Sequence, residues 1–217
     1  MTSFFLRLFF SISFFVTASA SAQVAATVEG VQTPAWVERD GKRTPLVPGM
    51  QLRAGDQVVT GGGSRIAIKL SEGSLVKLGE NGTLRFTELS VRREVFKAVI
   101  NVLQGAFRFT TDVAAKARKR EVSIAVSTVV VGIRGTDVWG KSMAERQVVC
   151  LIEGRIEIAV PGESALTLDQ PRQFYRREGG KAQPIGLVEP KQIAEWAREV
   201  DIEPGKGLPR DTKGTAR

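Results

Sequence analysis

Large apolar residues alternate with polar or small ones through the middle of the chain, from residue 28 to residue 168. In the segment Ile66-Ala67-Ile68-Lys69-Leu70, every second position is a large aliphatic residue. A period of two residues is typical of β-strands with one buried and one exposed face. Glycine-bearing turns separate the segments that show this period. The pattern predicts an all-β domain of short strands joined by glycine turns.

Two segments are apolar without alternation, Val129–Val131 and Val148–Ile152. A strand that is apolar at every position is typical of a strand covered on both faces. We therefore expect other elements to cover both faces of the sheet at each of these two segments.

Residues 66–74 and 75–83 resemble each other, since each ends in an acid or amide, a glycine and a hydroxyl residue. Such self-similarity fits successive hairpins or short coils of a β-solenoid. The pattern leaves two arrangements open, a β-solenoid-like one and a barrel-like sandwich.

The pattern changes at residues 189–202, where the apolar residues recur at helical spacing. The residues that fall on one helical face are Ile193, Trp196, Ala197 and Val200. We expect one C-terminal amphipathic helix that packs on its own sheet, with a partner-docking face around Trp196 as the alternative. Residues 203–217 carry glycine, proline and charge with little to bury, so they predict a disordered tail.

The first 22 residues are typical of a cleavable secretory signal peptide. Arg7 precedes an apolar run, and small residues at Ala20 and Ala22 are spaced as at a cleavage site. The apolar run is shorter than the roughly 20 residues that span a bilayer. We expect an exported mature chain that begins near Gln23, has no transmembrane span and resides in the periplasm.

Composition narrows the chemistry. The chain has a formal net charge of +8, no histidine and one cysteine, Cys150. Without imidazole or a second thiol, Ser-His-Asp catalysis and Cys- or His-based metal sites are excluded. Ser74 and Lys77 have the Ser-x-x-Lys spacing of penicillin-recognising enzymes, but the other motifs of that class are missing. We expect no enzyme activity, no metal, no cofactor and a buried, inert thiol, with an intermolecular disulfide as the alternative.

A cluster of basic residues offers a candidate binding loop. Its members are Lys116, Arg118, Lys119 and Arg120. Such a patch attracts polyanions, so an anionic cell-envelope polymer is a candidate partner, and a solvated loop is the simpler interpretation. Nucleic acid is not expected, because the chain is exported and has few aromatic residues for base stacking.

Four segments, found in this order, carry a family resemblance. They are GMQLRAGDQVVT at 49–60, LSEGS at 70–74, VGIRGTDV at 131–138 and VCLIEGRIEI at 149–158. Together they resemble the FecR domain family over residues 28–170. The matching positions are Gly55, Asp56, Thr60, Gly73, Gly132, Arg134, Gly135, Thr136 and Gly154.

Most of these motif residues favour a structural role. Gly132 and Gly135 are expected to bend the backbone at positive φ. The Thr136 hydroxyl can bond its own turn. The carboxylate of Asp56 can close a turn through its side chain. We expect Arg134 to pair with a turn carboxylate, either Asp56 or Asp137.

The resemblance implies a regulatory protein. Well-understood members of the family that it resembles are transmembrane regulators. They have a cytoplasmic sigma-factor regulator, one membrane helix and a periplasmic domain that interacts with an outer-membrane transporter. In this chain, the predicted signal peptide stands where those members have the sigma-factor regulator and the membrane helix. We therefore expect a stand-alone module with a FecR-like β domain at 23–188, which binds another envelope protein through strand edges or the helix face. The alternative is a binder of anionic envelope polymer through the basic loop.

Overall fold

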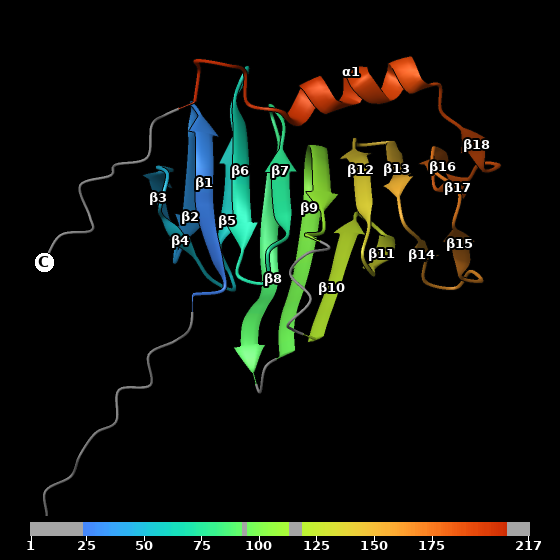
Figure 1. Cartoon of the computed structure of the whole chain (residues 1–217), viewed down its shortest axis with the longest axis horizontal. Helices are drawn as coiled ribbons and strands as arrows, with labels where there is room; N and C mark the ends of the chain where they lie inside the picture. Colours follow the sequence, from blue (N-terminus) through green and yellow to red (C-terminus); the bar gives the residue numbers. More distant parts are fainter. Residues whose placement is uncertain (1–23, 93–94, 113–118, 208–217) are drawn as a thin grey trace, which may run out of the picture.

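The computed structural model describes residues 24–92, 95–112 and 119–207 (Figure 1). The expected signal peptide at 1–22 lies outside these residues. The strands of the first half are β1 (Ala26–Gln32), β2 (Ala35–Arg39), β3 (Lys42–Pro45), β4 (Gln51–Leu52), β5 (Gln57–Thr60), β6 (Arg65–Leu70), β7 (Leu75–Leu78), β8 (Thr83–Arg92) and β9 (Val95–Thr110). Those of the second half are β10 (Lys119–Val126), β11 (Val129–Ile133), β12 (Asp137–Ser142), β13 (Arg146–Glu153), β14 (Ile156–Ala159), β15 (Leu166–Leu168), β16 (Gln173–Glu178), β17 (Lys181–Ala182) and β18 (Gly186–Leu187).

The strands form two layers, which we call sheet A and sheet B. Sheet A has the order β4-β1-β6-β7-β9-β12-β13-β16, with β17 and β18 both beside β16. Sheet B has the order β3-β2-β5-β8-β9-β10-β11-β14-β15. Among the described pairs, β9 and β10 are parallel and the others are antiparallel.

Strand β9 belongs to both layers. Residues 95–104 pair within sheet B, and residues 105–110 pair within sheet A. The change of sheet falls at Gly105, whose φ is 91°. A Cβ atom at Gly105 would lie 2.6 Å from the Cα of Gly82, so both backbone conformation and space require glycine there. This bend lets one long strand join the two layers.

The core lies between the two sheets. Phe86 and Ile100 of sheet B and Ile68 and Phe109 of sheet A all have 0% exposure and belong to one apolar cluster. The predicted all-β fold is therefore confirmed as an open sandwich. The solenoid-like arrangement is wrong, because β6 and β7, which carry the repeated segments, form an antiparallel hairpin rather than stacked parallel coils.

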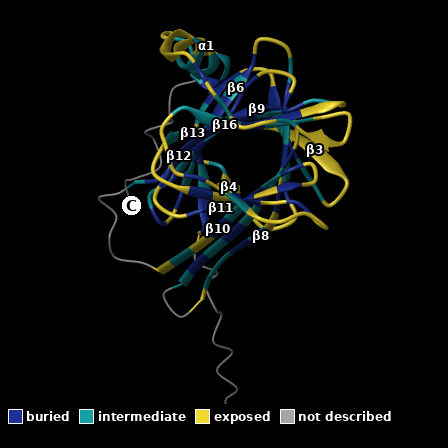
Figure 2. Cartoon of the chain, turned by 90° about the vertical axis from the view of Figure 1, so that its right-hand side faces the viewer, coloured by how far each residue is buried: buried dark blue, intermediate teal, exposed yellow. Residues whose placement is uncertain are grey.

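Helix α1 (Pro190–Val200) lies on the outer face of sheet A, on the side opposite β10 and β11 (Figure 2). The ring of Trp196 stacks on Trp139 of β12 with parallel planes and centroids 4.1 Å apart. Ile193 and Val200 join the same apolar cluster. The predicted amphipathic helix is confirmed. The alternative docking role of its Trp196 face is wrong, because the protein's own sheet covers that face.

The two continuous apolar segments have different surroundings. In Val148–Ile152, alternate residues face the sandwich core and the cluster beneath α1, so the predicted burial on both faces is confirmed. In Val129–Val131, the outward-facing Val130 is 39% exposed, so the same prediction is wrong there. No described element covers the outer face of sheet B at Val130.

The segment after α1 continues along sheet A. The Lys77 ammonium lies 2.5 Å from Asp201. The backbone N–H of Glu203 donates to Gln32 Oε1 at 2.9 Å. Hydrogen bonds from Lys206 and Gln32 lower the pKa of the Glu203 carboxyl. The prediction of a disordered tail is therefore wrong for residues 203–207, and residues 208–217 lie outside the described part. In the described part of the chain, no helix has the length and apolar character to cross a membrane.

Candidate functional site

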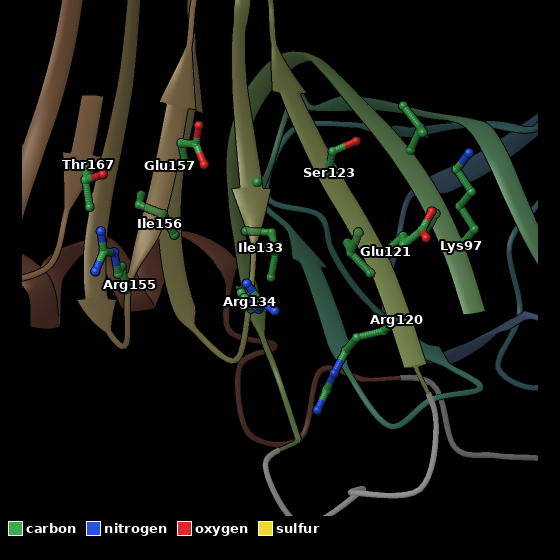
Figure 3. Close-up of a pocket in the computed structure, with 14 residues that line it drawn as sticks. Lys97, Arg120, Glu121, Ser123, Ile133, Arg134, Arg155, Ile156, Glu157 and Thr167 are labelled. Atoms are coloured by element: carbon green, nitrogen blue, oxygen red, sulfur yellow. The ribbon is translucent and has the colours of Figure 1, made fainter. Parts of the chain in front are cut away.

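An open groove of about 800 Å³ crosses the outer face of sheet B (Figure 3). Residues of β9, β10, β11, β14 and β15 line it. The groove therefore lies on the sheet face that no helix of the described residues covers. It also contains residues of the Arg-Gly-Thr segment and of the basic cluster, which are separate in the sequence.

The floor of the groove is a row of residues in register across five strands. Ser123 of β10 pairs with Val99 of β9 and with Gly132 of β11. Glu157 of β14 pairs with Gly132 and with Thr167 of β15. These five residues face away from the core, since their neighbours along each strand point into it. Because Gly132 lies at the centre of the row, the floor is hollow there.

Three arginines gather at one end of the groove (Figure 3). They are Arg120, Arg134 and Arg155. Arg134 and Arg155 are exposed and make no ion pair or side-chain hydrogen bond with any described residue. Arg120 reaches only the carbonyl oxygen of Asp112, at 3.5 Å. Within the described residues, these guanidinium groups are available to a ligand.

Further along the groove the charges are mixed. Lys97 and Glu121 face each other across the β9–β10 pair, and Glu157 stands on the other side of Gly132. With the three arginines, the lining holds four basic and two acidic side chains. The groove is therefore basic at one end and carries carboxylates near its middle.

The predicted pairing of Arg134 with a motif carboxylate is wrong. Asp56 accepts two hydrogen bonds from Arg39, at 2.7 and 2.6 Å. Asp137 accepts two from Arg108, at 2.9 and 2.6 Å. These side-chain hydrogen bonds raise the pKa of both arginines. Since other arginines already engage both carboxylates, Arg134 projects into the groove.

The motif residues around Asp56 build turns. The Asp56 carboxylate is buried and accepts a hydrogen bond from the backbone N–H of Arg53 at 2.8 Å, so the predicted turn closure is confirmed. The Thr60 hydroxyl donates to the carbonyl oxygen of Gly79 at 2.6 Å and accepts from the N–H of Gly82 at 2.8 Å. The two side chains hold the loops at opposite ends of β5, and neither lines the groove.

Two motif glycines pack against each other. Gly135 and Gly154 have φ values of 70° and 91°. A Cβ atom at Gly154 would lie 2.5 Å from the carbonyl oxygen of Gly135, so the Arg-Gly-Thr and Glu-Gly-Arg turns are in close contact. This contact joins the two turns that carry Arg134 and Arg155, both of which line the groove. Gly55 and Gly73 also have positive φ, in line with their predicted turn role.

Gly132 and Thr136 differ from expectation. Gly132 is not among the glycines with positive φ. The Thr136 hydroxyl is buried and has no hydrogen-bond partner among the described residues. The backbone N–H of Thr136 donates to the hydroxyl of Thr111 at 3.1 Å. The expected bend at Gly132 and the expected turn bond of the Thr136 hydroxyl are therefore wrong.

The basic cluster is only partly described. Lys116 and Arg118 lie outside the described residues, while Lys119 and Arg120 begin β10. Sequence reasoning missed Arg155 and Lys97 as groove residues. A signal for Arg155 was available, because it directly follows the Glu153-Gly154 turn of the family motif.

The other candidates for chemistry have structural surroundings. Ser74 has 0% exposure, while Lys77 pairs with Asp201 on the opposite face of the strand, so the two do not form a catalytic pair. Burial raises the pKa of the Cys150 thiol to about 12, which keeps it protonated and unreactive. Among the described residues, no group of three or more His, Cys, Asp or Glu could hold a metal ion.

The exposed edge of sheet B at β3 is protected. Every residue of β3 is exposed, but Pro45 lacks an N–H, and the guanidinium of Arg43 lies 4.0 Å from the Trp36 ring centroid. Proline and cations on an edge strand oppose pairing with another chain. This edge is therefore a poorer docking surface than the groove.

Fold and site together define a two-layer all-β domain with a charged groove on the face that no described element covers. Residues 56–157 match the family model described as FecR protein. The predicted resemblance to the FecR family is therefore confirmed over these residues.

Solved structures agree at the level of the fold. Two crystal structures of a candidate anti-sigma factor from Parabacteroides distasonis ATCC 8503 are each similar, with a TM-score of 0.52 and 16% sequence identity. Each match covers 64% of this chain and 63% of that chain, so it spans less than two thirds of the neighbour's length. No curated protein matches the chain at a significant level.

Proposed function

We propose that this FecR domain is a non-catalytic protein-interaction module of the bacterial cell envelope, which senses or scaffolds another envelope protein. One observation carries the proposal: the motif arginine Arg134 lines an open groove and has no partner among the described residues, while the motif carboxylates Asp56 and Asp137 pair with other arginines. Unpaired, exposed arginines on a rigid sheet are suited to recognising a partner.

The family supports a regulatory role for this interaction. The domain matches the FecR model, and its fold is similar to that of a candidate anti-sigma factor. The match does not extend over the whole of that neighbour, so direct sigma-factor control is not part of the proposal.

We place the module in the periplasm on the strength of its first 22 residues. Fractionation and N-terminal sequencing of the mature protein test this placement. We expect a periplasmic chain that begins near Gln23. Full-length protein retained in the cytoplasm would contradict the placement.

Site-specific photo-crosslinking in living cells tests the interaction itself. A photoreactive residue at Thr167 lies in the groove, and one at Lys42 on the protected β3 edge is the matched control. We expect a discrete protein adduct, identified by mass spectrometry, from Thr167 and not from Lys42. The absence of protein adducts from every surface position tried would overturn the proposal.

An anionic envelope polymer is the second candidate, favoured by the three groove arginines and by Lys119. Pull-down of purified envelope fractions at low and high salt separates the two. Polyanion binding falls steeply with salt, because it depends on counterion release. A protein partner that buries apolar and hydrogen-bonded surface is retained.

A further inference from the structure

Neither the backbone conformation nor the packing requires a glycine at position 132. Its φ is not in the left-handed region, and a Cβ atom there would approach nothing closer than the Glu157 carbonyl oxygen, at 3.8 Å. That distance is an ordinary contact. By contrast, a Cβ at Gly140 of β12 would lie 2.4 Å from the ring of Phe107, so packing requires glycine there.

Glycine in the middle of a strand weakens the strand, since it adds backbone entropy and packs no side chain. At Gly132 the structure offers no compensating contact. A strand glycine without such a contact is found where a ligand or another backbone approaches closely. Gly132 lies at the centre of the groove floor, so any side chain there would project into the groove.

The charges around Gly132 indicate what approaches. Arg120, Arg134 and Arg155 form a basic end that suits carboxylates, because guanidinium groups bind them with paired hydrogen bonds. Glu157 belongs to the floor, next to Gly132, and Glu121 also lines the groove. A polymer with an anionic group on every repeat would bring like charges next to these carboxylates. A polypeptide can place acidic residues at one end and neutral or basic ones along the floor.

We propose that the groove binds an extended acidic segment of a partner protein, whose backbone crosses over Gly132 and whose carboxylates pair with Arg134, Arg155 and Arg120. The hydroxyls of Ser123 and Thr167, on either side of Gly132, supply further hydrogen bonds. This assignment rests on the proposed function and names the chemistry of the partner at the same site.

Substitution of Gly132 by valine tests the close approach. The variant fills the floor with a β-branched residue that suits a strand, so thermal unfolding is expected to stay at or above the wild-type temperature. The matched control is Ala159→Val, on the outward face of the neighbouring β14 and outside the groove lining. Gly132→Ala is a smaller second variant, in case the valine disturbs the strand.

Binding is measured with fluorescent synthetic peptides that carry two glutamates at varied spacing, and with their glutamine counterparts. Oligogalacturonate serves as the carbohydrate polyanion. We expect Gly132→Val to weaken binding of the best glutamate peptide by about tenfold or more, with Ala159→Val unchanged. Arg134→Gln and Arg155→Gln should each weaken it by about tenfold, with the outside control Arg85→Gln unchanged.

Three results would overturn the assignment: equal binding of glutamate and glutamine peptides, tighter binding of oligogalacturonate, or wild-type binding by a folded Gly132→Val variant. In-cell crosslinks separate this failure from failure of the proposed function. If protein adducts form from other surfaces while the groove variants leave them unchanged, the interaction module stands and the groove assignment falls.

Discussion

Each of the two sheets of the sandwich contains a continuous apolar run, but only one of the two runs is buried on its outer face. On sheet A, Val148–Ile152 lies under α1, in a cluster centred on the Trp139–Trp196 stack. On sheet B, Val129–Val131 leaves Val130 exposed at the rim of a face that carries the groove. Helix α1 covers one face, whereas no described element covers the other.

The same contrast holds for two arginines. Arg108, on sheet A, is paired with Asp137 and half-buried. Arg134, on sheet B, follows β11 and has no described partner. Residues on the outer face of sheet A therefore contribute to stability, while residues on the outer face of sheet B are free to contribute to binding.

The largest effect is expected when the covered face is opened. Trp139→Ala removes the 2% exposed partner of Trp196, so the cluster beneath α1 loses its largest buried side chain. The free energy of unfolding should fall by about 3 kcal/mol or more, measured by chemical denaturation. Trp36→Ala is the control, since Trp36 contacts Arg43 at the surface, and should cost about 1 kcal/mol or less. Equal losses for the two variants would show that α1 does not close this face.

A smaller effect is expected from the paired arginine. Arg108→Gln leaves the largely buried Asp137 carboxylate without its two charged hydrogen bonds. The free energy of unfolding should fall by about 2 kcal/mol. The matched variant Arg134→Gln should change it by less than about 0.5 kcal/mol, because no described contact is lost. A large loss for Arg134→Gln in thermal or chemical unfolding would contradict its assignment to binding.

The two valines give a direct comparison of the faces. Val148→Thr places a hydroxyl beneath α1, where Val148 is 9% exposed, and should cost about 1 to 2 kcal/mol. Val130→Thr places the same hydroxyl in solvent and should cost less than about 0.5 kcal/mol. Denaturant titrations of both variants provide the measurement. A similar cost at both positions would mean that the outer face of sheet B is covered in solution.

The smallest expected effect comes from ionisation of the Cys150 thiol. The folded thiol of Cys150 has a pKa of about 12, raised from 9.0 by burial and then by the charge of Asp137. Between these values an unfolded chain ionises its thiol while the folded chain keeps the proton. The thiol's contribution to stability is therefore present below pH 9 and is lost as pH rises toward 12.

Iodoacetamide labelling followed by mass spectrometry checks this. At pH about 9, where a thiol with the ordinary pKa of 9.0 is half ionised, native Cys150 should remain unlabelled and react only after denaturation. Val130→Cys, combined with Cys150→Ala, should label in the native state because position 130 is exposed. Rapid labelling of native Cys150 would show that α1 opens readily.

Local pattern was sufficient for much of the fold. Period-two alternation predicted the strands, helical spacing predicted α1 and its buried face, and Gly55-Asp56 predicted a closed turn. These features depend on residues close in the chain, where backbone preference and side-chain direction are decided locally. The order of strands in two sheets could not be predicted, because it depends on pairings between distant segments such as β1 and β6.

The site shows the same division. Sequence alone marked Arg134 and Arg120 as candidates, and the matching segments identified the FecR domain. It gave Arg134 the wrong partner, because Arg39 and Arg108 reach the motif carboxylates only through the sheet registers. Arg155 entered the site for a similar reason, since the contact between Gly135 and Gly154 joins two turns that are apart in sequence.

The amino-acid sequence by itself determined the all-β fold, the FecR-like segment at residues 56–157, the one amphipathic helix and the excess of basic residues. Only the tertiary structure decided which apolar run α1 covers, which arginines remain unpaired and where a strand glycine leaves space. An apolar stripe specifies that something must cover it but not what covers it, and a charge specifies attraction but not its partner. The cover of the stripe and the partner of the charge are decided only when segments that are distant in the sequence pack together in the fold.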